Sequence, residues 1–419
     1  MSTTKSKLTS LPLPKPASEI KVATLVTIAM LLDGYDMQAA AFAAPSIRAD
    51  WGVEASALGP MLAAALIGMA LGTAVGGFIG DRYGRRPALL TGVLTFSLFA
   101  LISAFAKDLF WLTVLRFLTG IGMGAVIPNA MALVSEVISD RWRGIAMTVA
   151  LAAVPCGGMV GAALSSWLIP EFGWRASLGV GGIIPLAFLL LLWAWLPESL
   201  RFNPDKNRQE AQEKDQTQGT FAILFSQENV RVTAGLWLAF FGSMLVHYSY
   251  LSWLPTLLSA SGINTGDAVR GSMYFNLFGV AGSFAGSWFV LRRGSLELLL
   301  ITCALITVGS AAIAWQLQNS PNYWGLIAGI AIAGCGAATL QVTLFSLAAQ
   351  AYPIFCRARG IGWAAGIGRA GAILSAALGG IVVQMEDGVT IFLTVIGIIP
   401  LIVVAGLFVI NRHTGPSRE

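Results

Sequence analysis

Two carboxylates interrupt an apolar stretch near the start of the chain. Asp33 and Asp36 are the charged residues of the run from residue 22 to residue 47. In a helix of 3.6 residues per turn, side chains three positions apart project from one face. Acids held this way in apolar surroundings can take up and release protons, and they titrate as a coupled pair. Asp33 and Asp36 are therefore candidates for proton binding.

Two arginines also fall inside apolar runs. Arg116 lies in the run 109–135, and Arg369 lies in the run 360–384. At ~1.5 Å per residue, Asp36 lies ~21 Å from one membrane face and Arg116 ~10 Å from the other, nearly the same depth in a ~30 Å core. Arg116 could hold Asp36 in a structural ion pair, or it could bind an anion and leave Asp36 to titrate. Arg369 could equally contact a ligand, cap a helix or pair with a carbonyl.

The composition places these residues in a membrane. Of the 419 residues, 56% are apolar and 11% are charged, whereas a soluble chain carries roughly 25% charged residues. Twelve apolar runs can each cross a hydrocarbon core of ~30 Å. They cover residues 22–47, 57–79, 88–106, 109–135, 144–168, 177–196, 232–258, 270–291, 296–316, 323–351, 360–384 and 389–410. We expect an all-α integral membrane protein.

The runs form two sets of six on either side of a polar stretch. We expect a tail over residues 1–21, a six-helix bundle over 22–200, a linker over 201–230, a second bundle over 231–411 and a tail over 412–419. Most of the 26 lysines and arginines fall in the tails, the linker and the loops of one side. Because such loops stay inside, we expect a multi-pass protein of the cell (inner) membrane with both termini, both tails and the linker cytoplasmic. The net charge of +5 then reflects topology and requires no nucleic-acid partner.

Few residues offer enzymatic or metal chemistry. The four cysteines stand singly, and His247 and His413 are the two histidines. No cysteine or histidine spacing is typical of a metal site. We expect no metal, no cofactor other than a coupling proton, and no enzyme activity.

The two halves repeat each other. GMGA at 122–125 is matched by GCGA at 334–337, and Asn129 and Gln341 each follow the first glycine by the same offset. Glycines that suit close helix contacts recur with the same spacing: Gly68, Gly72, Gly76 and Gly80 with Gly282 and Gly286, and Gly157 and Gly161 with Gly362 and Gly366. Two pseudo-symmetric six-helix bundles are typical of carriers that rock about a site near the membrane midplane.

Several motifs resemble those of a known family. GFIGDRYGRR at 77–86 and RFLTGIGMG at 116–124 resemble the loop and fourth-span signatures of the major facilitator superfamily. DGYD at 33–36, SWLPTLL at 252–258 and RGIGW at 359–363 are similar to the aromatic acid:proton symporters of that superfamily. In the second half, LRRG at 291–294 lacks the acid of its counterpart at 81–84, so a symmetric salt-bridge lock is not expected there.

The resemblance implies the major facilitator fold and proton-coupled import, by alternating access, of an aromatic or related unsaturated carboxylate. Relatives of this kind carry hydroxybenzoates, benzoate, hydroxyphenylpropionates or muconate. It also implies that Arg369 is required for transport. One chain supplies both halves, so we expect a functional monomer in the lipid bilayer.

Three groups of residues are predicted to act in transport. The proton-coupling residues are Asp33 and Asp36. The substrate contacts are Arg116, Arg369, Tyr35, Asn129, His247, Tyr250, Trp253 and Gln341, although the aromatic residues near position 250 could instead belong to an interfacial belt. The gating residues are Asp81, Arg82, Arg85, Glu136, Arg143 and Arg357.

Two alternatives stay open. A sugar or drug carrier would leave the buried arginines without an anion, and VPCGG at 154–158 lacks the upstream glycines of the antiporter motif that it partly resembles. A membrane enzyme or sensor would need a nucleophile, a metal cluster or a soluble domain, and the sequence indicates none.

Overall fold

The structure, a computed structural model, describes residues 16–199, 224–226, 229–319, 322–353 and 356–411. Much of the predicted first tail, linker and last tail therefore lies outside the described residues. The first helix begins at Pro16, so part of the predicted first tail is helical.

The described chain is all-helical and crosses the membrane twelve times, as predicted. The crossings of the first half are α1 (Pro16–Trp51), α2 (Ala55–Tyr83), α3 (Arg85–Ser103), α4 (Leu109–Val137), α5 (Asp140–Phe172) and α6 (Trp174–Trp195). Those of the second half are α9 (Val230–Ala260), α10 (Thr265–Arg293), α11 (Ser295–Gln318), α12 (Tyr323–Ala351), α13 (Arg357–Val383), and α14 (Gly388–Ile398) with α15 (Pro400–Asn411). The break between α14 and α15 precedes a proline, which suits the first turn of a helix.

Length and hydropathy alone identify ten of these crossings among the described residues. The other two are α1 and α10, which carry polar side chains on buried faces. Asp33, Asp36 and Gln38 are buried in α1, and Asn276 is buried in α10. Polar residues that face the interior of a bundle lower the hydropathy of a helix without exposing charge to lipid.

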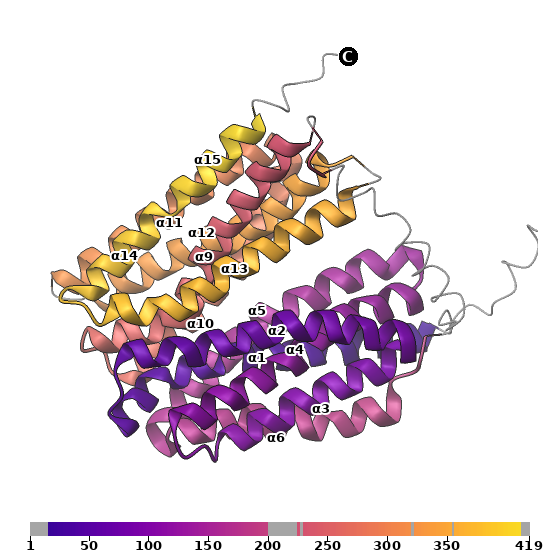
Figure 1. The fold of residues 1–419 in the computed structure, drawn as a ribbon, viewed down its shortest axis with the longest axis horizontal. Helices are drawn as coiled ribbons and strands as arrows, with labels where there is room; N and C mark the ends of the chain where they lie inside the picture. The colour runs from indigo at the N-terminus through magenta and orange to yellow at the C-terminus, as the bar shows by residue number, and fades with distance from the viewer. Residues whose placement is uncertain (1–15, 200–223, 227–228, 320–321, 354–355, 412–419) are drawn as a thin grey trace, which may run out of the picture.

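The helices form two bundles that lie side by side (Figure 1). The first contains α1 to α6 and the second α9 to α15, and the halves pack mainly through α2 with α13 and through α5 with α10. At one end the halves meet closely. A Cβ added at Gly59 or Gly380 would collide with the backbone of Ala377 or Ala55.

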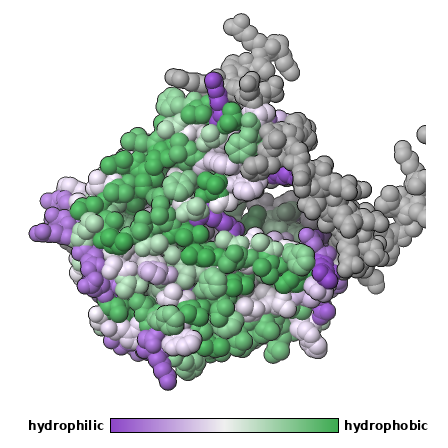
Figure 2. All heavy atoms as spheres, in the orientation of Figure 1, coloured by the Kyte–Doolittle hydropathy of each residue, from purple (hydrophilic) through white to green (hydrophobic). Residues whose placement is uncertain are grey.

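At the other end, the ribbons of the two halves diverge towards the C-terminus (Figure 1). Figure 2 shows a hollow between the halves at this end, and apolar side chains over much of the visible surface of both bundles. We call the closed end the α2–α13 contact end and the other the open end. A surface this apolar suits contact with lipid.

The glycine repeat sets the packing within each half. Cβ atoms added at Gly68, Gly72, Gly76 and Gly80 would meet successive turns of α4, and those at Gly282 and Gly286 would meet α12. Two matching turns also follow α2 and α10, where Gly84 and Gly294 have φ of 110° and 86°, values that favour glycine. The close contacts predicted for Gly68 to Gly80 in the first half and for Gly282 and Gly286 in the second are therefore confirmed.

One glycine pair breaks the repeat. Gly157 and Gly161 of α5 pack against α1 as predicted, but the Cβ positions of Gly362 and Gly366 in α13 meet no described atom within 4 Å. The prediction that this second pair forms a close helix contact is wrong for the conformation described. The pair lies in the first half of α13, remote from the α2–α13 contact end.

Candidate functional site

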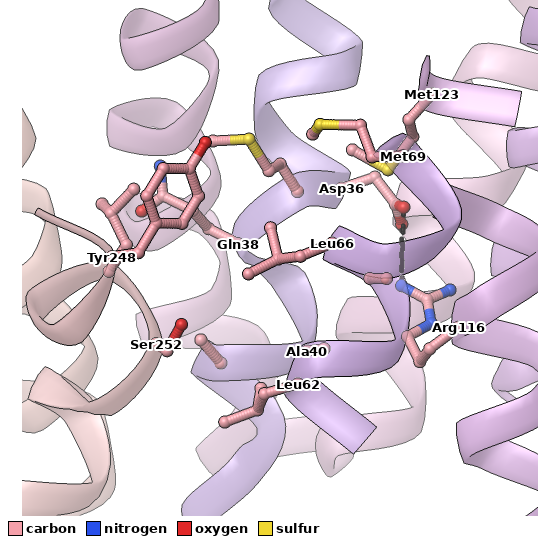
Figure 3. Close-up of a pocket in the computed structure, with 14 residues that line it drawn as sticks. Asp36, Gln38, Ala40, Leu62, Leu66, Met69, Arg116, Met123, Tyr248 and Ser252 are labelled. Atoms are coloured by element: carbon pink, nitrogen blue, oxygen red, sulfur yellow. Dashed lines mark hydrogen bonds and ion pairs between the residues drawn. The ribbon is translucent and has the colours of Figure 1, made fainter. Parts of the chain in front are cut away.

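A small cavity lies between the halves, with walls from α1, α2, α4 and α9 (Figure 3). Its lining consists of Asp36, Met37, Gln38, Ala40, Ala41, Leu62, Ala65, Leu66, Met69, Arg116, Met123, Tyr248, Leu251 and Ser252. The volume is about 30 Å³, which holds about one water molecule. Most of the wall is apolar, with a few polar groups, which is the usual character of a small-molecule site. The cavity has to widen to admit an organic ligand.

Asp36 and Arg116 form an ion pair at one side of this cavity. The distance from Nη1 of Arg116 to Oδ1 of Asp36 is 3.3 Å, and both side chains are buried. Nη2 of Arg116 also donates to the hydroxyl groups of Ser103 at 3.1 Å and Thr119 at 3.2 Å. The similar depths inferred from residue counting therefore correspond to a direct contact. The hydroxyl groups hold the guanidinium in place whether or not Asp36 is charged.

Asp33 is fully buried one turn before Asp36, close enough for the two carboxylates to repel each other when both are ionised. Among the described residues, neither carboxylate oxygen of Asp33 has a hydrogen-bond partner. A buried charge without a partner is costly. The two acids therefore sit in different surroundings, because only Asp36 has a cation beside it in the described structure.

Glycines between α1 and α5 fix the face on which these acids project. A Cβ at Gly34 would collide with the backbone carbonyl of Val154, and one at Gly157 would collide with that of Leu31. The backbones of the two helices therefore touch at this level. This contact turns Asp36 towards α4, and it explains the glycine between the two acids in the DGYD motif.

A pair of amides joins the halves on another side of the cavity. Nδ2 of Asn276 in α10 donates to Oε1 of Gln38 in α1 at 2.9 Å, and Nε2 of Gln38 donates back to Oδ1 of Asn276 at 3.3 Å. Asn276 also donates to the carbonyl of Ser272 at 2.8 Å. Both amides are buried. Neither residue was predicted to act in transport.

Arg369 also reaches across the interface between the halves. Its Nη1 donates to the hydroxyl of Thr73 in α2 at 3.2 Å, and the side chain is half-buried. Thr73 lies one turn from Met69, which lines the cavity, and its hydroxyl donates to the carbonyl of Met69. Arg369 is thus a cation next to the cavity, and its partner here is a neutral group.

The other predicted contacts in the first half take part in helix packing. The hydroxyl of Tyr35 donates to the carbonyl of Ser177 at 2.8 Å, which ties α1 to α6. The amide of Asn129 donates to the carbonyls of Gly76 and Ala125 at 2.9 and 2.8 Å, which ties α4 to α2.

The predicted contacts on α9 also face neighbouring helices. Tyr250 shares a hydrogen bond of 2.6 Å with Ser310 and stacks on Phe275, and His247 lies beside the same ring. The indole of Trp253 donates to the carbonyl of Ser375 at 3.1 Å. Gln341 is half-buried in α12. Substrate contact by these four residues stays a prediction, and the side chains of α9 that line the cavity are instead Tyr248, Leu251 and Ser252.

The predicted gating residues form a network that is only partly connected. Arg85 pairs with Asp81 at 2.7 Å and with Glu136 at 3.2 Å, which links α2, α3 and α4. Arg143 pairs instead with Asp140, a neighbour on the first turn of α5. The remaining two predicted gating residues have local contacts: Arg82 lies over the ring of Tyr83, and Arg357 donates to the carbonyl of Tyr352.

Glu198 belongs to the same region and was not predicted to act there. Its Oε1 accepts hydrogen bonds from the backbone amides of Arg85, Arg86 and Ser199 at 3.1, 3.2 and 2.9 Å. It therefore supplies the cap of α3, whose preceding residue is Gly84 and has no side chain to do so.

Comparison with known proteins places this arrangement in a family. The model of the Major Facilitator Superfamily matches residues 26–376. The chain belongs to the major facilitator superfamily. Its fold agrees with a crystal structure of a D-xylose-proton symporter, with a TM-score of 0.77 at 18% identity over 93% of this chain and 97% of that one.

Relatives with curated names confirm the resemblance to aromatic acid carriers. The gallate transporter of Pseudomonas putida is 34% identical, over 96% of this chain and 93% of its own length. The 4-hydroxybenzoate transporter PcaK of the same organism is 36% identical, over 85% of this chain and 84% of its own. The protein is accordingly a multi-pass membrane transporter and not an enzyme.

Proposed function

We propose that this transporter is a proton-coupled symporter that imports an aromatic carboxylate by alternating access. The observation that carries the proposal is the buried pair of Asp36 and Arg116 in the wall of an otherwise mostly apolar cavity. An aromatic acid has the matching chemistry, with one anionic group for the arginine and an apolar ring for the leucines and methionines. The names of the relatives agree with this substrate class.

The coupling follows from competition for Arg116. While Asp36 is ionised, it occupies the guanidinium that the substrate carboxylate needs. A proton on Asp36 releases the guanidinium, and the substrate then restores the neutrality of the pair. Since moving charge through a closed, low-dielectric site is costly, the halves rock most readily when proton and anion are both bound or both absent.

Asp33 supplies a second proton site. It has no hydrogen-bond donor among the described residues, so a proton is the partner that lets it stay buried at low cost. Arg369, next to the cavity on α13, is placed to receive the carboxylate after it leaves Arg116.

The direction of transport rests on the predicted topology. The protein is proposed to lie in the inner membrane with both termini in the cytoplasm. The open end, towards which the C-terminus lies, then faces the cytoplasm. The structure then corresponds to an inward-facing state of a monomer, in which one chain provides both halves of the site.

Uptake into proteoliposomes tests the proposal. The purified protein should accumulate labelled 4-hydroxybenzoate or benzoate when the outside is acidified, and a protonophore should abolish the accumulation. Xylose, added in excess, should not compete. Accumulation that ignores the pH gradient would contradict proton coupling, and competition by xylose without competition by aromatic acids would favour a sugar carrier.

A further inference from the structure

The cavity has two polar ends. Asp36 and Gln38 are two residues apart on α1, so their side chains leave the helix about 200° apart. They flank the apolar face of α1 that lines the cavity. Figure 3 shows Asp36 and Arg116 on one side and Gln38 with Tyr248 on the other, with Leu66 between them. A ligand that fills this space meets a cation at one end and, at the other, the amide of Gln38, which is hydrogen-bonded to Asn276 behind it.

The amide end spans the interface between the halves. Gln38 belongs to the first half and Asn276 to the second, and each satisfies the other through the reciprocal hydrogen bonds at 2.9 and 3.3 Å. Rocking that opens the α2–α13 contact end has to separate these helices and break both bonds. The amides then need other partners, because a buried polar group without one is costly.

We propose that Gln38 and Asn276 determine specificity, by favouring aromatic acids whose ring carries a hydroxyl group at the end away from the carboxylate. This inference rests on the proposed function, in which the carboxylate binds Arg116. A hydroxyl group donates one hydrogen bond and accepts two, so it can bridge one amide from each half. An unsubstituted ring leaves both amides without that bridge. Closure of the halves over the substrate is therefore more favourable for the hydroxylated acid.

Gly158 shows how closely the amide pair is fitted. A Cβ at this position in α5 would collide with Nε2 of Gln38 and would lie 3.3 Å from Oδ1 of Asn276. The substitution Gly158→Ala therefore displaces the amides without removing them. This variant therefore tests the effect of the amide pair on substrate preference without replacing either amide.

The test compares benzoate with 4-hydroxybenzoate as substrates of the full-length transporter in proteoliposomes. In Gln38→Met and Asn276→Leu, the kcat/KM for 4-hydroxybenzoate should fall about tenfold more than the kcat/KM for benzoate. Gly158→Ala should lower the ratio in the same direction. Continued benzoate transport shows that each variant is folded.

The matched control is Gln384→Leu. Gln384, which follows the last residue of α13, also donates an amide hydrogen bond across the halves, to Glu54 at 2.6 Å, but it lies at the exposed end of the interface, away from the cavity lining. It should leave the substrate ratio unchanged. Equal losses of kcat/KM for both acids in the Gln38 and Asn276 variants, or an unchanged ratio of 4-hydroxybenzoate to benzoate, would overturn the inference. Uptake of both acids by the wild-type protein would in that case still support the proposed function. Failure of the wild-type protein to move either acid would overturn both.

Discussion

Replacement of Asp36 by asparagine should separate substrate binding from accumulation. Asp36 is buried and lies 3.3 Å from Arg116, so its charge decides whether the guanidinium is free for an anion. Asparagine keeps the shape of the side chain but cannot ionise. Arg116 is then open to the substrate at every pH, and the substrate is expected to exchange across the membrane without carrying a proton on this site.

The size of the effect follows from the number of protons moved. One proton carried with each monovalent anion supports ~10-fold accumulation per pH unit, because one unit corresponds to ~1.4 kcal/mol. A second proton on Asp33 would add another ~10-fold, and it would make transport respond to the membrane potential by ~2.3 kcal/mol per 100 mV, or roughly 50-fold. Asp36→Asn should lose the ~10-fold per pH unit that its own proton supplies, and Asp33→Asn should lose the response to potential while keeping the ~10-fold per pH unit that Asp36 supplies.

Steady-state uptake in proteoliposomes measures these ratios, with the pH gradient and a potassium diffusion potential imposed separately. Counterflow of labelled against unlabelled acid shows whether a variant still binds and exchanges substrate. Asp267→Asn is a matched control, because Asp267 pairs with Arg270 at 2.8 Å at the start of α10, outside the site. If Asp36→Asn accumulated substrate to the wild-type level, Asp36 would have no part in proton coupling.

Three further predictions concern the rocking motion and the fold. In a variant without the four native cysteines, a short cleavable cross-linker between Glu54→Cys and Gln384→Cys should stop uptake, because the native side chains form a 2.6 Å hydrogen bond between the halves. Uptake that continues after complete cross-linking would contradict closure at this end. Gly72→Ala should lower the melting temperature in detergent, since overpacking against Ile121 costs ~1–3 kcal/mol, whereas Gly77→Ala meets open space and should not; equal melting of the two variants would argue against the α2–α4 contact. Glu198→Gln removes a charged cap from α3 and should lower the free energy of unfolding by ~1 kcal/mol. Its melting temperature should therefore be lower than that of the exposed control Glu171→Gln. Equal melting temperatures of these two variants would show that the cap contributes little.

The sequence was sufficient to predict the parts of the fold that depend on spacing alone. Apolar runs predicted the crossings, because the length needed to span hydrocarbon is fixed by the rise of a helix. Glycines four residues apart from Gly68 to Gly80 predicted a close contact, because that spacing keeps them on one face. Counting residues from the ends of two runs predicted similar depths for Asp36 and Arg116, and in the structure their side chains form an ion pair.

The rotation of α9 could not be predicted in the same way. This helix is buried on most of its surface, so its apolar pattern does not indicate which face meets the cavity. Tyr250 and Trp253, which are predicted to contact substrate, hydrogen-bond to α11 and α13 in this structure, whereas Tyr248 and Ser252 line the cavity. The pairing of Gln38 with Asn276 depends on how the two halves dock, and a single sequence carries no signal of that register.

The chemistry of the contacts between the halves suits the rocking motion that we propose. The ion pairs of Asp36 with Arg116 and of Arg85 with Glu136 lie within one half, so they need not break when the halves separate. Two contacts that cross the halves near the cavity have a neutral group on at least one side: Gln38 with Asn276 and Arg369 with Thr73. Breaking a buried ion pair in each cycle would cost ~3–5 kcal/mol, a slowing of roughly 200- to 5,000-fold, whereas a neutral hydrogen bond of ~1 kcal/mol costs about 5-fold. In the proposed cycle, the position of Asp36 and Arg116 in the same half therefore leaves their charge states to the substrate and the proton, and leaves the motion to bonds that are weak enough to break.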